Sequence, residues 1–252
     1  MVYLIPIYFY MVITLNLLLL LKLLLLPLIY IIVLYLSAPT KTLSLKGLIL
    51  CFLGGILSTN FVQIYYALFD IIPTNYFEQY FFSVAPREEI SKLTTFLLVI
   101  FLLKKRNLTP VSLMYYSGVI GLGFATFENF MYGSAYGEDI IVARSFTATL
   151  GHLIFGLFLG YWVGLGNIDS NKYRNRSLFS SYVQRHKKIK MIVYTLIGLL
   201  CAIIYHGLWN YNLAVSWNAS TPIMIFMVIF GLSLCKLAST DLYNQYTKSL
   251  EK

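Results

Sequence analysis

The sequence predicts an all-α bundle of seven or eight membrane-spanning helices, and three observations support that prediction. Of the 252 residues, 59% are hydrophobic and only 12% are charged, about half the charged fraction of an average soluble domain. Apolar stretches long enough to cross about 30 Å of hydrocarbon recur along the chain between short polar breaks. Basic residues gather in alternate breaks. We therefore expect one transmembrane domain over residues 1–252, placed as a multi-pass protein in the lipid bilayer of a cell membrane.

The first apolar stretch, residues 3–36, is longer than a single crossing requires. We expect Lys22 and Pro27 to mark a hairpin or a kink, so that these N-terminal anchor helices make one or two spans. No small-residue cleavage site follows, and we interpret the stretch as a retained anchor rather than a signal peptide. Six further stretches predict one crossing each, over residues 43–69, 78–103, 109–136, 139–166, 189–216 and 219–240.

The distribution of charge predicts the orientation of the bundle. Fifteen of the 19 Lys and Arg residues lie in every second connection or in the C-terminal tail, whereas the other connections are acidic or uncharged. The positive-inside rule therefore places the basic connections in the cytoplasm. Topology and contact with anionic lipid account for the net charge of +9. Because no folded basic face is predicted, we expect no nucleic-acid partner.

Some ionisable residues lie inside the predicted crossings, where each costs roughly 2.5 to 3.5 kcal/mol and usually serves a function. In "PREEISK", Lys92 follows Glu88 by four residues and Glu89 by three, so its ammonium can pair with either carboxylate on a helix. Pro86 suits the opening of a helical turn. Of two neighbouring carboxylates in a low dielectric, one becomes available as a proton acceptor. A purely structural ion pair is the alternative.

The next two crossings carry comparable polar segments. "GLGFATFENF" places Glu128 and Asn129 near small residues that let a neighbouring helix approach closely. In the following crossing, Arg144, His152 and three glycines recur at intervals of four residues. We expect them to form one stripe that faces partner helices rather than lipid. Interhelical hydrogen bonding alone is the alternative in each case.

A fourth segment, "YHGLWN", sets His206 and Asn210 one helical turn apart on one face. In the predicted topology Glu88, Glu128, His152 and His206 all lie about nine to thirteen residues from the outer boundary, or roughly 14–20 Å by helical rise. Unrelated structural polar groups would scatter in depth. The shared level predicts one polar chamber that opens toward the outer leaflet.

These four segments resemble the PrsW family of bacterial intramembrane proteases, which is related to the CAAX prenyl endopeptidases. The matching elements are "EEISK" at 88–92, "FATFEN" at 124–129, "HLIFG" at 152–156 and "HGLWN" at 206–210. The resemblance covers roughly residues 75–215 and implies a catalytic core at about 75–216. It implies hydrolysis of a peptide bond at membrane depth, in a membrane-anchored protein substrate such as an anti-sigma factor, on the outward side.

Amide hydrolysis needs a base for water, donors for the oxyanion and an acid for the leaving amine. We expect Glu88 to be the base, with Glu89 held ionised by Lys92 or shuttling the proton, and His152 to orient the water. The full set of candidate catalytic residues is Glu88, Glu89, Glu128, His152, His206 and Asn210, supported by Lys92, Asn129 and Arg144.

His206 and Asn210 are expected to donate to the tetrahedral oxygen, and Arg144 to act as a counter-ion to a carboxylate. Glu128 would complete the water site or bind a metal. No cofactor is certain, but Glu128, His152 and His206 could hold Zn²⁺ with an open position. The HExxH spacing of common zinc proteases is absent.

Two other functions remain open. A proton-coupled transporter or channel also uses intramembrane carboxylates and histidines, but the halves show no internal repeat and the polar groups stop near one level. A noncatalytic immunity or scaffold protein could keep the same fold. The three cysteines lack CxxC spacing, so neither a disulfide framework nor a thiolate metal site is predicted.

Overall fold

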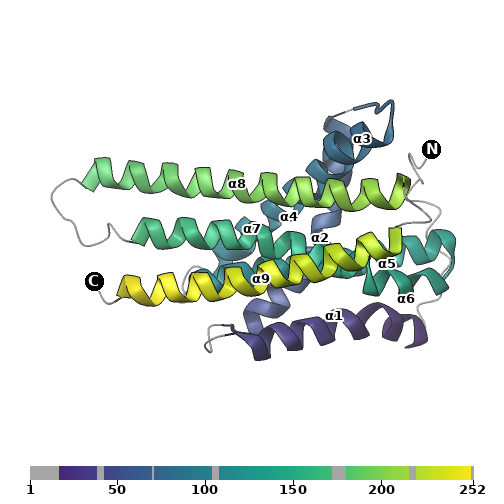
Figure 1. The fold of residues 1–252 in the computed structure, drawn as a ribbon, viewed down its shortest axis with the longest axis horizontal. Helices are drawn as coiled ribbons and strands as arrows, with labels where there is room; N and C mark the ends of the chain where they lie inside the picture. The colour runs from purple at the N-terminus through teal and green to yellow at the C-terminus, as the bar shows by residue number, and fades with distance from the viewer. Residues whose placement is uncertain are drawn as a thin grey trace.

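The computed structural model describes residues 17–38, 43–69, 71–103, 108–171, 180–215 and 220–250, and these parts contain helices and no strand (Figure 1). In chain order the elements are α1 (Leu17–Ser37), α2 (Leu45–Leu68), α3 (Tyr76–Glu78), η2 (Gln79–Val84), α4 (Ala85–Leu103), α5 (Pro110–Tyr136), α6 (Asp139–Phe146), α7 (Ala148–Asn171), α8 (Ser180–Val215) and α9 (Ser220–Leu250). The prediction of an all-α multi-pass bundle is confirmed.

Six stretches of the described helices are long and apolar enough to cross a membrane, in α1, α2, α5, α6 with α7, α8 and α9. The run from Tyr76 to Leu103 through α3, η2 and α4 is unbroken and makes a seventh rod, whose apolar character is interrupted by its charged residues. Residues 1–16 and the basic connections at 39–42, 104–107 and 172–179 lie outside the described residues.

We expected a hairpin or a kink at Lys22 and Pro27. The hairpin is wrong, because α1 continues through both residues, and the kink stays a prediction. Lys22 instead donates through its Nζ to Glu138 Oε2 at 3.2 Å, in the connection between α5 and α6. This ion pair offsets part of the cost of carrying a charge on an otherwise apolar helix. Over the described residues α1 makes one span.

Two irregularities lie beside the polar segments. The crossing predicted over 139–166 is divided at Thr147, so the predicted stripe from Arg144 to His152 does not lie on one continuous helix. The hydroxyl of Thr147 donates to the carbonyl of Ala143 at 3.0 Å, a contact that tends to bend helices. The π-helix η2 ends directly before α4, where Pro86 has no N–H to continue the helical ladder.

α5 is the central helix, packed against α7 on one side and α2 on the other. A Cβ added at Gly121 would lie 2.1 Å from the carbonyl oxygen of His152, and one at Gly123 would lie 2.0 Å from that of Phe52. Both contacts therefore bring backbone against backbone, as predicted for the small residues of this segment. Figure 1 shows α7, α8 and α9 along the long axis, with α2 and α4 passing behind them at a steeper angle.

Candidate active site

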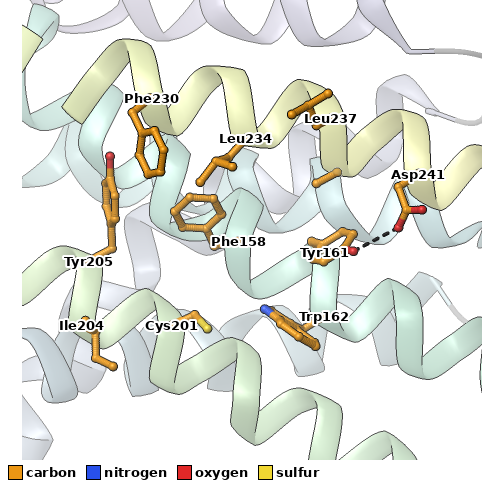
Figure 2. A pocket seen from close by; sticks show the side chains of 11 residues that line it. Phe158, Tyr161, Trp162, Cys201, Ile204, Tyr205, Phe230, Leu234, Leu237 and Asp241 are labelled. Carbon is orange, nitrogen blue, oxygen red and sulfur yellow. Dashed lines mark hydrogen bonds between the residues drawn. The ribbon is translucent and has the colours of Figure 1, made fainter. Parts of the chain in front are cut away.

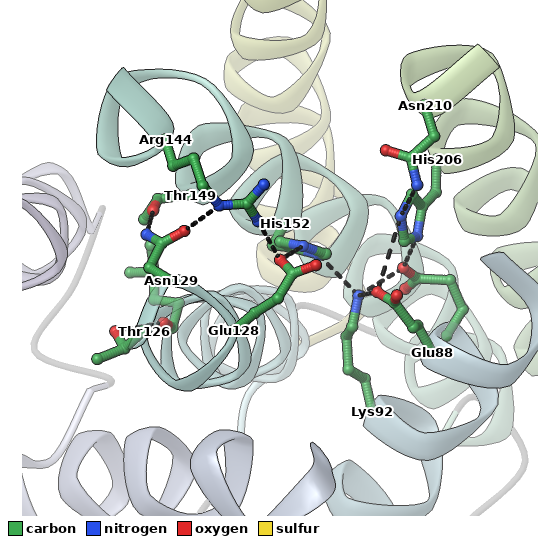
Figure 3. A network of polar contacts seen from close by, with 12 residues as sticks. Glu88, Lys92, Thr126, Glu128, Asn129, Arg144, Thr149, His152, His206 and Asn210 are labelled. Carbon is green, nitrogen blue, oxygen red and sulfur yellow. Dashed lines mark hydrogen bonds and ion pairs between the residues drawn. The ribbon is translucent and has the colours of Figure 1, made fainter. Parts of the chain in front are cut away.

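Side chains from four helices meet in one buried polar cluster (Figure 3). The members are Glu88, Glu89 and Lys92 on α4, Glu128 on α5, His152 on α7, and His206 and Asn210 on α8. Glu89 is fully buried, and Lys92 and His206 are each 2% exposed. The side chains of Glu88 and Glu128 keep 11% and 15% exposure, so the cluster opens beside these carboxylates. The structure thus brings together the residues that the four sequence segments supply.

Glu89 and Asn210 fix the orientation of the His206 ring. Glu89 Oε1 lies 2.7 Å from His206 Nδ1, and Asn210 Nδ2 lies 3.0 Å from His206 Nε2. The amide nitrogen of Asn210 is a donor, so His206 Nε2 accepts this hydrogen bond. The ring proton therefore resides on Nδ1, which donates a hydrogen bond to Glu89. His206 is therefore a neutral imidazole whose Nε2 lone pair points away from Glu89.

Lys92 and Glu128 fix the His152 ring in the same manner. Lys92 Nζ lies 2.8 Å from His152 Nδ1, and Glu128 Oε2 lies 3.0 Å from His152 Nε2. An ammonium can only donate, so His152 Nδ1 accepts from Lys92. Nε2 therefore carries the ring proton and donates a hydrogen bond to Glu128. Lys92 Nζ also lies 2.6 Å from Glu89 Oε1, which realises the ion pair predicted from their spacing. One lysine thus links both carboxylate-bound histidines.

Arg144 holds Glu128 and Asn129 in place. Its Nη2 donates to Glu128 Oε2 at 2.8 Å, and its Nε donates to Asn129 Oδ1 at 2.9 Å. Asn129 in turn donates to the hydroxyl of Thr149 at 2.9 Å. The guanidinium also lies 3.7 Å from the centroid of the Tyr132 ring. The counter-ion role expected for Arg144 agrees with this geometry, and the break at Thr147 does not prevent it.

Glu88 Oε2 is buried without a hydrogen-bond partner among the described residues, as is Glu89 Oε2, but Glu89 is held by Lys92 and His206 through its other oxygen. Glu88 Oε2 faces His206 Nε2 at 3.8 Å and Lys92 Nζ at 3.9 Å. Buried polar groups are normally paired, so an orphaned carboxylate oxygen calls for an explanation such as a ligand or a catalytic role. The lone pair of His206 Nε2 accepts from Asn210, so a water or a metal ion that took the place of the Asn210 N–H could bridge Glu88 and His206.

The donor set in this cluster fits a divalent metal. Ligand atoms of Glu88, His152 and His206 all lie within 4.8 Å of one another, and two imidazoles with one carboxylate are a common catalytic zinc set. Each histidine also donates its N–H to a carboxylate, as metal-ligating histidines usually do. We predicted Glu128 in this set, but Glu128 Oε2 is bonded to both Arg144 and His152, and Glu88 is the carboxylate grouped with the two histidines.

Sequence reasoning passed over Arg87, which is 5% exposed and lies one residue before Glu88. Its guanidinium donates to Ser83 in η2 and to the carbonyl of Phe69 at the end of α2, and it lies 4.3 Å from the centroid of the Tyr66 ring. Arg87 therefore ties the helix that carries Glu88 to α2. The charge of Arg87, which lies in the same apolar run as Glu88, was the sequence feature that could have identified it.

An apolar hollow of about 520 Å³ lies elsewhere, among α7, α8 and α9 (Figure 2). Its lining is aromatic and aliphatic, with Phe158, Trp162 and Leu234 among its walls. Asp241 lies at its edge and accepts a hydrogen bond from the hydroxyl of Tyr161 at 3.0 Å. The carboxylates and histidines of the polar cluster do not line this hollow.

Comparison with known proteins finds one matching family and several relatives. A model of the PrsW family of intramembrane metalloproteases matches residues 43–234. The chain is 27% identical over 124 residues to Protease PrsW of Shouchella clausii, an alignment that covers 48% of this chain and 49% of that protein. It is 26% identical over 197 residues to Protease PrsW of Oceanobacillus iheyensis, covering 75% and 81% of the two chains. The match to Protease PrsW of Bacillus subtilis is 24% over 126 residues and covers about half of each chain. No solved structure matches.

Proposed function

Because the chain belongs to the PrsW family of intramembrane metalloproteases, we propose that it is a membrane-embedded endopeptidase that cuts a membrane-anchored protein. The observation that supports this most directly is the convergence of Glu88, His152 and His206 on one buried volume. An anti-sigma factor is the substrate class that the family resemblance suggests. The alignment with the first of the relatives spans about half of that protein, so the activity assigned to this chain is our proposal.

The cut is proposed to occur near the outer leaflet. Glu88 lies twelve residues after the start of its rod at Tyr76, and His206 lies nine residues before the end of α8 at Val215. At 1.5 Å per residue these positions are about 14–18 Å from the helix ends. The basic connections assign those ends to the outer side. A substrate held in the bilayer would therefore present a bond near its outward end.

Glu88 is the proposed base. Its Oε2 and His206 Nε2 are two acceptors 3.8 Å apart, a spacing at which one water can donate a hydrogen to each. Glu88 takes one proton as the water oxygen attacks the carbonyl carbon, and returns it to the leaving amine as the C–N bond breaks. His206 orients the water as an acceptor. We assign donation to the oxyanion to the amide nitrogen of Asn210, which must turn away from His206 Nε2 so that the single lone pair of that nitrogen can accept from the water.

Glu88, His152 and His206 would hold a divalent metal such as zinc, which would supply Lewis-acid activation of the water and of the scissile carbonyl. The carboxylates behind the histidines fix which ring nitrogen carries the lone pair. Glu128 is itself held by Arg144, and Glu89 by Lys92. These contacts therefore keep the proton of His206 on Nδ1 and that of His152 on Nε2 before any ligand enters.

The test is cleavage of a single-span peptide by the full-length protein reconstituted in liposomes, followed by mass spectrometry of the products. We expect Glu88→Gln and His206→Ala to abolish cleavage, and Glu88→Gln to fold normally because it is close in shape. Lys22→Gln, which removes a charge paired with Glu138 and not with the cluster, is the matched control that should cleave like the wild type. Proton or solute flux without cleavage, or cleavage retained by Glu88→Gln, would refute the proposal.

A further inference from the structure

The Lys92 ammonium occupies a central position in the candidate site. It is 2.6 Å from Glu89 Oε1, 2.8 Å from His152 Nδ1 and 3.9 Å from Glu88 Oε2. It also lies 4.3 Å from the centroid of the Phe124 ring, a position favourable for a cation. Lys92 therefore has the surroundings of a bound cation, with two carboxylates, an imidazole lone pair and an aromatic face.

This position conflicts with coordination of a metal by His152. A neutral imidazole has one lone pair on its ring nitrogens, and a metal ligand must offer that lone pair. Binding through Nδ1 would displace Lys92 directly. Binding through Nε2 would require the ring proton to move to Nδ1, where it would face the N–H of Lys92, donor against donor. Either route needs the hydrogen bond between Lys92 and His152 to break.

We propose that Lys92 is an internal cation that competes with a divalent metal for His152, so that metal loading requires the lysine to withdraw. The inference rests on the metal set given under the proposed function. Lys92 has somewhere to go, since its flexible stem can release Nδ1 while Nζ remains paired with Glu89. The free energy of the hydrogen bond between Lys92 and His152 is thereby subtracted from the affinity of an incoming ion. Lys92 stays paired with Glu89 before and after the metal binds.

The test measures metal affinity rather than cleavage, on the full-length protein in nanodiscs. Co²⁺ is titrated and its visible absorption followed, and Zn²⁺ affinity is obtained by competition against the bound Co²⁺. We expect Lys92→Gln to bind Co²⁺ about tenfold more tightly or better, since a hydrogen bond from a charged donor no longer has to be broken. Equal or weaker binding by Lys92→Gln would overturn the proposal.

Arg144→Gln is the matched control. It removes one positive charge from the same cluster, but Arg144 contacts Glu128 and Asn129 and no nitrogen of His152. If the effect were only a change in the field at the metal, both variants would tighten binding, the nearer Lys92 by more, and that result would contradict direct competition. Tightening confined to the Lys92 variant supports it.

Removing Lys92 alone leaves Glu89 buried without its cation, so a second comparison guards against misfolding. Glu89→Gln/Lys92→Met removes both charges of the pair, which proteins tolerate better than loss of one. It should bind Co²⁺ more tightly than Glu89→Gln alone, and equal affinity would again refute the inference. Cleavage by the wild type is measured separately, so a protein that binds metal as expected but cuts nothing would refute the proposed function while leaving the competition intact.

Discussion

Gly121→Ala should disable the site without altering any of its polar residues. The added Cβ would lie 2.1 Å from the carbonyl oxygen of His152 and 2.8 Å from its carbonyl carbon. Ordinary Cβ contacts begin at 3.4 Å, so α5 and α7 must separate by about 1.3 Å at the residue that carries the imidazole. Both partners at the contact are backbone, and neither can rotate out of the way.

The displacement acts on the hydrogen bond between Glu128 on α5 and His152 on α7, which is 3.0 Å long. An added separation of about 1 Å breaks that bond and moves the imidazole away from Glu88. We expect the variant to lose about 1–3 kcal/mol of stability from overpacking and about a hundredfold in kcat/KM, the scale of a 1 Å misplacement. The assays are thermal unfolding in nanodiscs and cleavage of the single-span peptide.

Gly166→Ala is the control, because its Cβ would meet the side-chain sulfur of Met191 at 3.1 Å and the Cβ of Tyr194 at 3.2 Å. The flexible methionine can give way, and the contact lies toward the opposite end of α7 from His152. We expect this variant to keep most of its activity. Cleavage by Gly121→Ala within twofold of the control would refute the reasoning that the backbone contact sets the geometry of the site.

Three further predictions concern the surroundings of the cluster. Arg144→Gln should lower kcat about tenfold to a hundredfold with a smaller change in KM, because Arg144 positions Glu128 and through it His152; a change in KM alone would argue against a positioning role. A strong chelator should abolish cleavage and added Zn²⁺ or Co²⁺ should restore it, whereas chelator-resistant cleavage would indicate that Glu88 acts on water unaided. Lys22→Gln should cost at most about 1 kcal/mol in thermal unfolding, because the Lys22–Glu138 pair is 21% and 31% exposed; a larger loss would show that this pair anchors α1.

The sequence alone determined the helical crossings and the residues available for chemistry. The stretch predicted at 43–69 corresponds to Leu45–Leu68, and that at 109–136 to Pro110–Tyr136. These boundaries follow from local composition, because the hydrocarbon thickness fixes how long an apolar helix must be. Ionisable residues are rare inside a crossing because a charged group in hydrocarbon costs free energy. The main polar side chains could therefore be identified one helix at a time.

The sequence did not reveal which helices continue and which are interrupted. α1 continues through Lys22 and Pro27, and Glu138, 116 residues beyond Lys22, supplies a partner for the lysine. The break at Thr147 and the π-helix before Pro86 depend on hydrogen bonds that hydropathy does not register. Each departure reflects a contact or backbone geometry that a window of about 20 residues averages away.

Only the tertiary structure decided how the polar residues divide their roles. It grouped Glu88 rather than Glu128 with the two histidines, and it left Glu88 Oε2 as a buried carboxylate oxygen without a partner. It also set which nitrogen of each histidine accepts and which donates. The physical reason is that these roles depend on the rotation and separation of neighbouring helices. Backbone contacts at glycines such as Gly121 fix that geometry to within about 1 Å, whereas a one-dimensional pattern specifies only which face of a helix a residue occupies.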